Sequence, residues 1–117
     1  MDKRWKDVAA DQPPPQPGGV VVLDEAIRYV ELMGWPGLAD DLHARAEMGK
    51  DRYGTLLMTH NGRDAVMDCY QECLDALMYI TQAKLELPAE ESQQLLTART
   101  YLFVATKCLK EFIGRRD

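Results

Sequence analysis

Residues 64–86 read DAVMDCYQECLDALMYITQAKLE, and the placement of polar and apolar side chains along this stretch decides the fold class. At about 100° per residue, four acids and a tyrosine fall within roughly 40° of one line: Asp64, Asp68, Glu72, Asp75 and Tyr79. Mostly apolar side chains lie on the opposite side: Val66, Cys69, Tyr70, Cys73, Leu77 and Ile80. This pattern predicts a long amphipathic helix from about Gly62 to about Glu86.

Helical patterns continue on both sides of this stretch. Downstream, the sequence predicts a helix from about Pro88 to Ile113, in which six apolar residues repeat with heptad-like spacing: Leu95, Ala98, Leu102, Ala105, Leu109 and Phe112. Upstream, Asp24 can cap a short helix that Gly34 interrupts, and a second helix is predicted from Pro36 to Met48 with Gly49 as its C-terminal cap. We therefore expect an all-α fold, an antiparallel bundle of about four helices, with residues 20–117 as a single helical domain.

Residues 1–19 differ from the rest in composition, because they contain the run PPPQPGG at residues 13–19. Such a run favours extended polyproline geometry followed by a flexible joint, so we predict a Pro-rich flexible tail. The alternatives are a ligand for a proline-recognising domain or an arm exchanged between subunits. Residues 20–23, VVVL, could instead form a short strand, which would need a partner from another chain.

The composition excludes several classes of function. A net charge of -5 and a pI near 5.0 argue against binding to duplex nucleic acid, which normally requires a basic face. No apolar run approaches the roughly 20 residues that a membrane span requires, and no apolar segment of a secretory signal follows the charged start. The cysteines, Cys69, Cys73 and Cys108, form no CxxC pair, which favours reduced thiols that act in packing. We expect a cytoplasmic protein.

The acidic line on the helix over residues 64–86 is a candidate metal site. Asp64, Asp68 and Glu72 follow one another at repulsive i,i+4 spacing without an interleaved base, so something is expected to compensate their repulsion. Carboxylates one turn apart can share Mg²⁺, with water and phosphate oxygens as further ligands, and Glu72 and Asp75 are the first choice of ligands with Asp68 as a third. The alternatives are a solvated helix face and neutralisation by bases from another helix or subunit.

The segment before this helix is polar and punctuated by glycines, and we predict it to be a loop from Lys50 to Gly62 that carries a phosphate or nucleotide site. In that site Lys50, Arg52 and Arg63 attract phosphate, the amides of the helix start contribute donors, Tyr53 stacks on a base and His60 is a further donor. The candidate residues are Lys50, Arg52, Tyr53, Thr55, His60, Asn61, Arg63 and Asp64. A purely structural alternative makes Asn61 the N-cap of the following helix with Asp64 at its third position, and ties the loop arginines to the nearby acids.

Residues 71–79, QECLDALMY, resemble the second acidic motif of the MazG-like all-α nucleoside triphosphate pyrophosphohydrolases, an ExxD followed by a tyrosine one turn later. Glu72 and Asp75 match its acidic positions. The stretches 50–55 and 60–64 also look like small phage and prophage proteins of that type, and the likeness covers roughly a third of the chain. The resemblance implies Mg²⁺ held by acids, cleavage of a nucleotide between its α and β phosphates, and a homo-oligomer. The first acidic motif of that family, of the EExxE kind, has no clear counterpart in this sequence.

Three functional hypotheses follow from these observations. The first is a nucleotide-binding helical protein of phage type, which acts as a Mg²⁺-dependent nucleoside triphosphate pyrophosphohydrolase if the acids hold the metal. The second is a protein that sequesters a nucleotide, such as a signalling nucleotide in a conflict between phage and host, without cleaving it. The third is an oligomeric interaction module without a small ligand.

Overall fold

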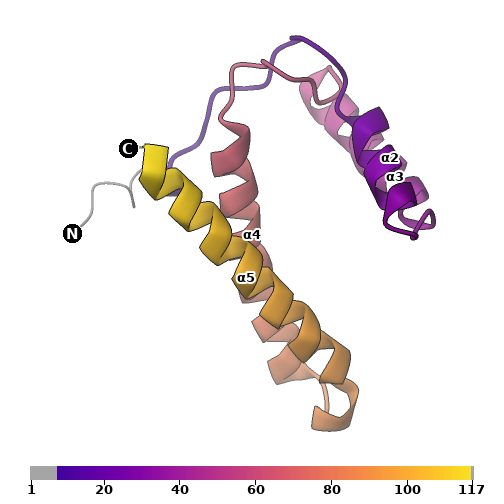
Figure 1. The fold of residues 1–117 in the computed structure, drawn as a ribbon, viewed down its shortest axis with the longest axis vertical. Coiled ribbons are helices and arrows are strands. Elements are labelled where there is room, and N and C mark those ends of the chain that lie inside the picture. The colour runs from indigo at the N-terminus through magenta and orange to yellow at the C-terminus, as the bar shows by residue number, and fades with distance from the viewer. Residues whose placement is uncertain (1–7, 117) are drawn as a thin grey trace. The chain divides into compact units, whose positions relative to one another are not determined.

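The structure is a computed structural model, and it describes residues 8–116. Its elements in chain order are α2 (Leu23–Leu32), α3 (Leu38–Tyr53), α4 (Ala65–Glu86), a 3₁₀ turn η1 (Ala89–Glu91) and α5 (Gln93–Arg116), as Figure 1 shows. Within the described residues the only extended pairing is one isolated antiparallel bridge between Val21 and Met58. The prediction of an all-α fold built from packed helices is confirmed.

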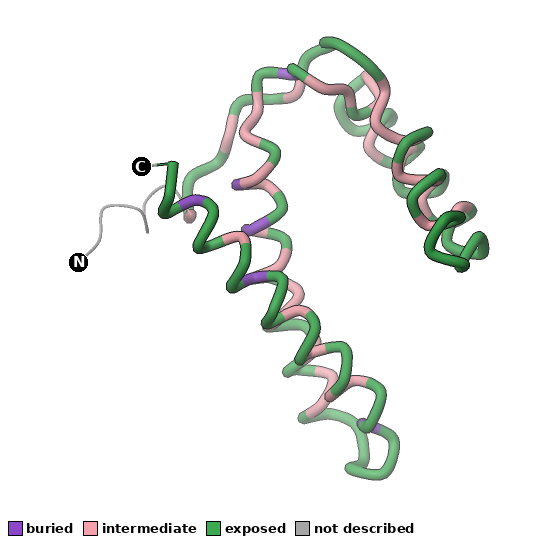
Figure 2. Tube along the Cα trace, in the orientation of Figure 1, coloured by how far each residue is buried: buried purple, intermediate pink, exposed green. Residues whose placement is uncertain are grey.

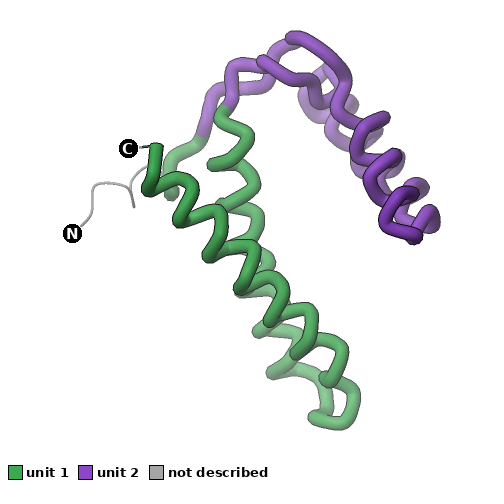
Figure 3. The backbone as a smooth tube through the Cα atoms, in the orientation of Figure 1, with its two compact units in different colours: residues 1–11, 64–117 green, residues 12–63 purple. Residues whose placement is uncertain are grey.

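The chain divides into two compact units (Figure 3), and each contains two consecutive helices that pack on each other. The first unit consists of residues 1–11 and 64–117, of which residues 8–11 and 64–116 are described, and it holds α4, η1 and α5. The second unit consists of residues 12–63 and holds α2 and α3. Each unit is therefore a helical hairpin.

Helix α4 ends where the sequence predicts but starts three residues later. Its last residue is Glu86, and Leu87 is extended (φ -97°, ψ 151°) because the following Pro88 disfavours helical geometry in the residue before it. Its N-cap is Asp64, whose carboxylate accepts a hydrogen bond from the backbone N–H of Met67 at 3.1 Å. The prediction of Asn61 as the N-cap is wrong, because Asp64 reaches the free N–H groups of the first turn and Asn61 lies in the preceding turn.

Helix α5 begins at Gln93 rather than at Pro88, because η1 occupies the first residues after the proline. The side of α5 that packs is offset from the predicted line. Its less exposed residues are Leu95, Leu96, Arg99, Leu102, Thr106, Leu109 and Ile113, whereas Ala98, Ala105 and Phe112 from the predicted line are exposed. Three of the six residues in the predicted repeat are therefore exposed, since α5 carries apolar residues on two sides and only one side packs against α4.

The hairpin of α4 and α5 has a small core near the start of α4 and the end of α5 (Figure 2). Its buried apolar residues are Met67, Tyr70 and Ile113, and partly buried residues surround them: Val8, Val66, Leu74 and Leu109. No side chain among residues 8–116 is completely buried. One packed seam between two helices therefore provides most of the apolar burial in this unit.

The two helices of the other hairpin differ from the prediction at their ends. Helix α2 starts at Leu23 after a backbone N-cap at Val22, so Asp24 lies inside the first turn, and the prediction that it caps the helix is wrong. Helix α3 continues through Gly49 to Tyr53, where Gly54 adopts a left-handed conformation (φ 78°) and its N–H donates to the Lys50 carbonyl at 2.7 Å. Gly49 is thus a helical residue, and the predicted loop from Lys50 is helical over its first four residues.

Residues 16–22, which begin within the Pro-rich run, pair with residues 57–61 of the same chain. The N–H of Gly19 donates to the Thr59 carbonyl at 2.7 Å, and the Thr59 N–H donates to the Val20 carbonyl at 2.8 Å. Two further backbone bonds flank this pair, from Gln16 to Asn61 and from Val22 to Leu57, each 3.0 Å long. The partner that residues 20–23 were expected to need from another chain therefore lies in this chain.

Candidate functional site

The candidate loop runs from Gly54 to Arg63, and left-handed residues shape it. Gly54 and Gly62 have positive φ, as does His60 at 55°, which is uncommon for a residue with a side chain. Asn61 is buried, and its Oδ1 accepts a hydrogen bond from the Arg63 N–H at 3.1 Å. This local side-chain bond fixes the turn that leads to α4.

Arg63 holds the loop to the Pro-rich segment. Its Nη1 donates to the carbonyl of Pro13 at 2.7 Å and to the carbonyl of Gln12 at 3.3 Å. Because proline has no backbone N–H, the carbonyl oxygens of a proline-rich segment find few hydrogen-bond donors within a helix or a sheet. The Arg63 guanidinium supplies donors to two of them. Arg63, predicted to bind phosphate, is therefore a residue that ties residues 12–13 to the loop.

Asp64, which was also predicted to bind phosphate, forms hydrogen bonds within its own unit instead. Arg116 at the end of α5 donates to both of its carboxylate oxygens, from Nη1 to Oδ1 at 3.2 Å and from Nη2 to Oδ2 at 2.6 Å. The hydrogen bond from Arg116 is the main reason why the pKa of Asp64 lies below its usual value of 3.8. Burial opposes this shift, and the bond from the Met67 N–H adds a further, smaller lowering of the pKa. The carboxylate occupies the place where an anion would meet the first amides of α4.

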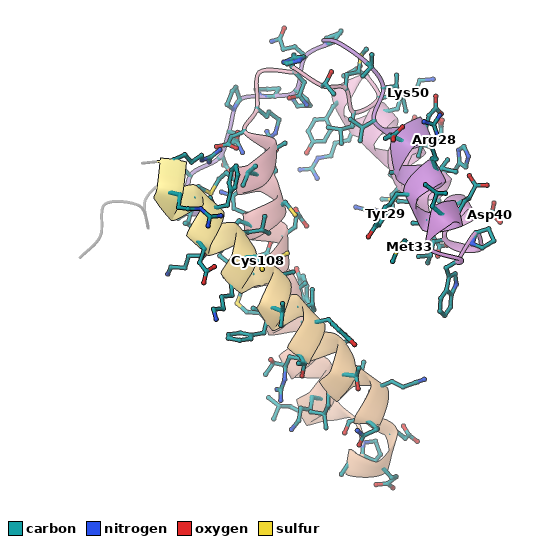
Figure 4. The ribbon with its side chains drawn as sticks, in the orientation of Figure 1. Arg28, Tyr29, Met33, Asp40, Lys50 and Cys108 are labelled. Atoms are coloured by element: carbon teal, nitrogen blue, oxygen red, sulfur yellow. The ribbon has the colours of Figure 1, made fainter. Side chains whose placement is uncertain are left out.

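Three other candidates gather at the last turn of α3, and all three are exposed. The Arg52 guanidinium carbon lies 5.1 Å from the centre of the Tyr53 ring, which is a cation–π contact. Lys50 lies one turn before Tyr53 and projects from the same end of α3, as Figure 4 shows. Neither Lys50 nor Arg52 forms an ion pair with any residue between 8 and 116.

Thr55 and His60 complete the set in this unit. The Thr55 hydroxyl donates to the neighbouring Leu56 carbonyl at 3.1 Å and is partly buried, so it stabilises the chain after α3. His60 is exposed beside the bonded pair of Gly19 and Thr59. Of the predicted site residues within 12–63, the exposed ones are therefore Lys50, Arg52, Tyr53 and His60.

The candidate metal ligands lie on α4 in the other unit. Glu72 and Asp75 are exposed, and Asp68 is partly buried. Within residues 8–116, no group of three or more His, Cys, Asp or Glu side chains is arranged to hold a metal ion. Two carboxylates at i,i+3 spacing can still share one cation when water, substrate or another chain supplies the remaining ligands.

The three cysteines have free thiols. Burial, followed by the neighbouring Cys73, raises the pKa of the Cys69 thiol above its usual value. Since the thiolate is the reactive form, this shift argues against a nucleophilic role for Cys69.

The structure also identifies positioning residues that the sequence pattern did not indicate. Arg116 pairs with Asp64 across 52 residues of sequence, and Gln71 donates from Nε2 to the carbonyls of Val8 at 2.7 Å and Ala10 at 3.2 Å. The Thr59 hydroxyl accepts from the Val20 N–H at 3.0 Å. No local signal marks these residues, because each partner is distant in sequence.

Within residues 8–116, no helix is long and apolar enough to cross a membrane. Comparison of the chain with protein-family models, with curated proteins and with solved structures finds no match.

Proposed function

We propose that this protein binds a nucleotide at the last turn of α3, with Lys50 and Arg52 at the phosphates and Tyr53 against the base. The observation that carries the proposal is the exposed contact between Arg52 and Tyr53, with Lys50 beside it. An aromatic ring offers a stacking face to any base, and guanidinium and ammonium groups offer the donors that phosphate prefers.

The charge balance of the chain supports this assignment. The protein has 19 acidic residues and 14 basic ones, yet Lys50 and Arg52 have no carboxylate partner among the described residues. Cations in the last turn of a helix do complement its dipole, which gives a structural role worth about 0.3–1 kcal/mol. The interaction with the helix dipole requires neither the contact between Arg52 and Tyr53 nor the exposure of Lys50, Arg52 and Tyr53. It therefore does not explain why these three side chains lie exposed at the same helix end.

The conformation of His60 adds a second supporting observation. A residue with a side chain in the left-handed region is strained by roughly 1–3 kcal/mol, and such strain occurs often at ligand-binding sites. In the proposal His60 is a further donor to the ligand, and Asn61 and Arg63 hold its loop in place through the bonds described above.

The test is a thermal-stability screen of the full chain against nucleoside mono-, di- and triphosphates and cyclic dinucleotides. A ligand that binds only the folded state raises the melting temperature. Arg52→Ala should abolish the rise, whereas Arg45→Ala, which removes an exposed arginine from the same helix, should leave it unchanged. No rise with any nucleotide, or an equal loss in both variants, would contradict the proposal.

Glu72 and Asp75 favour a second candidate, a Mg²⁺-dependent pyrophosphohydrolase of MazG-like type. Both carboxylates are exposed one turn apart on α4 and have no ion pair with the described residues, and they match the ExxD positions of that family. When bound, Mg²⁺ would neutralise phosphate charge and activate water; these two residues would hold it.

Chromatography of the ligand after incubation separates the two candidates. Hydrolysis predicts pyrophosphate release that requires Mg²⁺ and is lost in Glu72→Gln but kept in Glu111→Gln, which alters an exposed acid on α5. Recovery of the intact ligand in the presence of Mg²⁺ would support sequestration, for example of a signalling nucleotide, and would exclude the enzyme.

A further inference from the structure

The Pro-rich segment, residues 12–18, has the most restricted backbone in the described chain. The ring of each proline fixes φ at about −65°, and the residue before each proline is confined to extended geometry. Together these two restrictions act on every residue from 12 to 17. Residues 11–18 accordingly belong to no helix or strand (Figure 1). The geometry that satisfies both restrictions is polyproline II, which has about three residues per turn.

Burial along the segment follows the same period of three. Gln12 and Pro15 are half-buried, and a Cβ at Gly18, the next position in this series, would overlap backbone carbonyls of the loop. The four positions between them are exposed: Pro13, Pro14, Gln16 and Pro17. A polyproline II helix has three edges, so this period indicates that one edge faces the chain itself while two edges stay uncovered.

Hydrogen bonds hold the segment in this geometry without using its uncovered edges. Arg63 donates to the carbonyls of Gln12 and Pro13, and the Gln16 N–H donates to the Asn61 carbonyl at 3.0 Å. The carbonyls of the other three prolines of the segment accept no hydrogen bond within residues 8–116. The segment is therefore ordered by its own chain and still offers backbone acceptors to a partner.

Tethering the chain does not require this composition. Residues 19–22 form backbone hydrogen bonds to the same loop without any proline, so a segment that only ties the chain needs no run of proline rings at its surface. A polyproline II helix with two uncovered edges is instead the form in which an aromatic-lined groove takes its ligand. Such a groove contacts two edges of the helix, and here these edges present the pairs Pro13-Pro14 and Gln16-Pro17.

The charge of the segment indicates what this groove must offer. Residues 12–23 contain no charged side chain, although the whole chain has 19 acidic and 14 basic residues. Recognition of the segment therefore rests on apolar contact and hydrogen bonding. Aromatic side chains supply both, because their rings pack on proline rings and the N–H of tryptophan or the O–H of tyrosine can donate to the carbonyls that have no partner.

We propose that residues 13–17 are a docking site for a partner protein with an aromatic-lined groove, which receives the pairs Pro13-Pro14 and Gln16-Pro17. This inference does not depend on nucleotide binding, because it uses none of the residues at the end of α3. The tie through Arg63 has a role in it. A segment that is already ordered in the unbound protein loses less conformational entropy on docking, and the affinity rises accordingly.

Titration of the full chain into a panel of ¹⁵N-labelled SH3 and WW domains, followed by NMR, tests the docking site, because both classes carry aromatic-lined grooves for proline-rich ligands. At least one domain should show shifts at its groove. Pro14→Ala and Pro17→Ala should each weaken this binding at least about fivefold. Pro36→Ala, which removes an exposed proline of the same unit outside the segment, should leave the affinity unchanged. No binding by any domain, or equal affinity in all three variants, would overturn the proposal.

Two further measurements use the domain that binds in this titration. Arg63→Ala removes the tie to the segment and should weaken docking by roughly threefold to tenfold, with the helical circular dichroism of the chain unchanged. Full affinity in this variant would refute the role of the ordered segment. A rise in salt from about 50 mM to about 500 mM should change the affinity less than about twofold, since the segment carries no charge. A larger loss would mean that charged residues elsewhere on the chain bind the domain, which would refute the docking site.

Discussion

At the residue scale, the pair of Asp64 and Arg116 makes stability depend on pH. The pKa of Asp64 is lowered in the folded protein, so its contribution is present above the usual value of 3.8 and is lost as the pH falls through the folded value. Both partners are more than a third exposed, so we expect only about 0.5–1 kcal/mol from the pair.

Asp64→Asn isolates this contribution, because asparagine also caps helices and can keep the bond from the Met67 N–H. We expect a loss of about 0.5–1 kcal/mol in urea unfolding near neutral pH, and a difference from wild type that shrinks towards zero as the pH approaches about 2. A difference that stays constant across this range would contradict an electrostatic contribution from the pair of Asp64 and Arg116.

Gly18 is the residue on which the pairing of residues 16–22 with 57–61 depends most closely. A Cβ at Gly18 would overlap the carbonyl oxygens of Thr59 and His60, and both are backbone atoms that cannot turn away. Gly18→Ala should therefore lower the free energy of unfolding by about 1–3 kcal/mol.

Gly49→Ala is the matched control, since a Cβ there meets nothing within 4 Å and the residue lies inside α3. It should raise stability by about 0.5–1 kcal/mol. Chemical denaturation measures the free energy of unfolding of both variants and tests both expectations. Equal effects of the two substitutions would contradict the close approach at Gly18.

At the residue scale, prediction from sequence fails at the start of α4. The stretch from Asn61 to Asp64 contains two good N-cap residues three positions apart. Asp64 caps α4, whereas Asn61, which was predicted to be the cap, accepts a hydrogen bond from the Arg63 N–H. Asp64 also binds Arg116, and Arg63 binds the Pro13 carbonyl, and these partners are 50 or more residues away in sequence. Local pattern cannot supply that information.

At the element scale, the sequence predicts all four helices of the described residues but misplaces several ends. Gly49 suggests a C-cap, yet the helix continues because a glycine inside a helix costs only about 1 kcal/mol and Gly54 offers a better left-handed cap. Helix α5 has two apolar lines of similar spacing, and periodicity alone cannot decide which one faces α4.

The packed line of α5 can be tested at Ile113. This residue is 8% exposed in the core of the hairpin, so Ile113→Ala should reduce the free energy of unfolding by about 2–4 kcal/mol. Val104→Ala, at a position on the same helix that is 49% exposed, should change it by less than about 0.5 kcal/mol. Comparable losses measured in urea at the two positions would contradict the assigned seam.

At the scale of the whole molecule, the candidate residues divide between the two units. Lys50, Arg52, Tyr53 and His60 belong to residues 12–63, whereas Asp68, Glu72 and Asp75 belong to the hairpin of α4 and α5. Sequence analysis predicted one site from both sets because the residues lie close together along the chain. Proximity along the chain does not show that side chains of two separate units bind one ligand.

The two candidate functions rest on different units. The nucleotide proposal depends on exposed groups at the end of α3, and the hydrolysis candidate depends on Glu72 and Asp75 on α4. A protein that binds a nucleotide and leaves it intact in the presence of Mg²⁺ would support only the first.

Isothermal titration calorimetry tests the central claim, that the end of α3 binds a nucleotide, most directly. The ligand that gives the largest rise in melting temperature would be titrated into the wild type, Arg52→Ala and Arg45→Ala. We predict that Arg52→Ala weakens binding at least tenfold, about 1.4 kcal/mol, while Arg45→Ala matches the wild type. Equal affinity in all three proteins would contradict the claim and place the ligand elsewhere on the molecule.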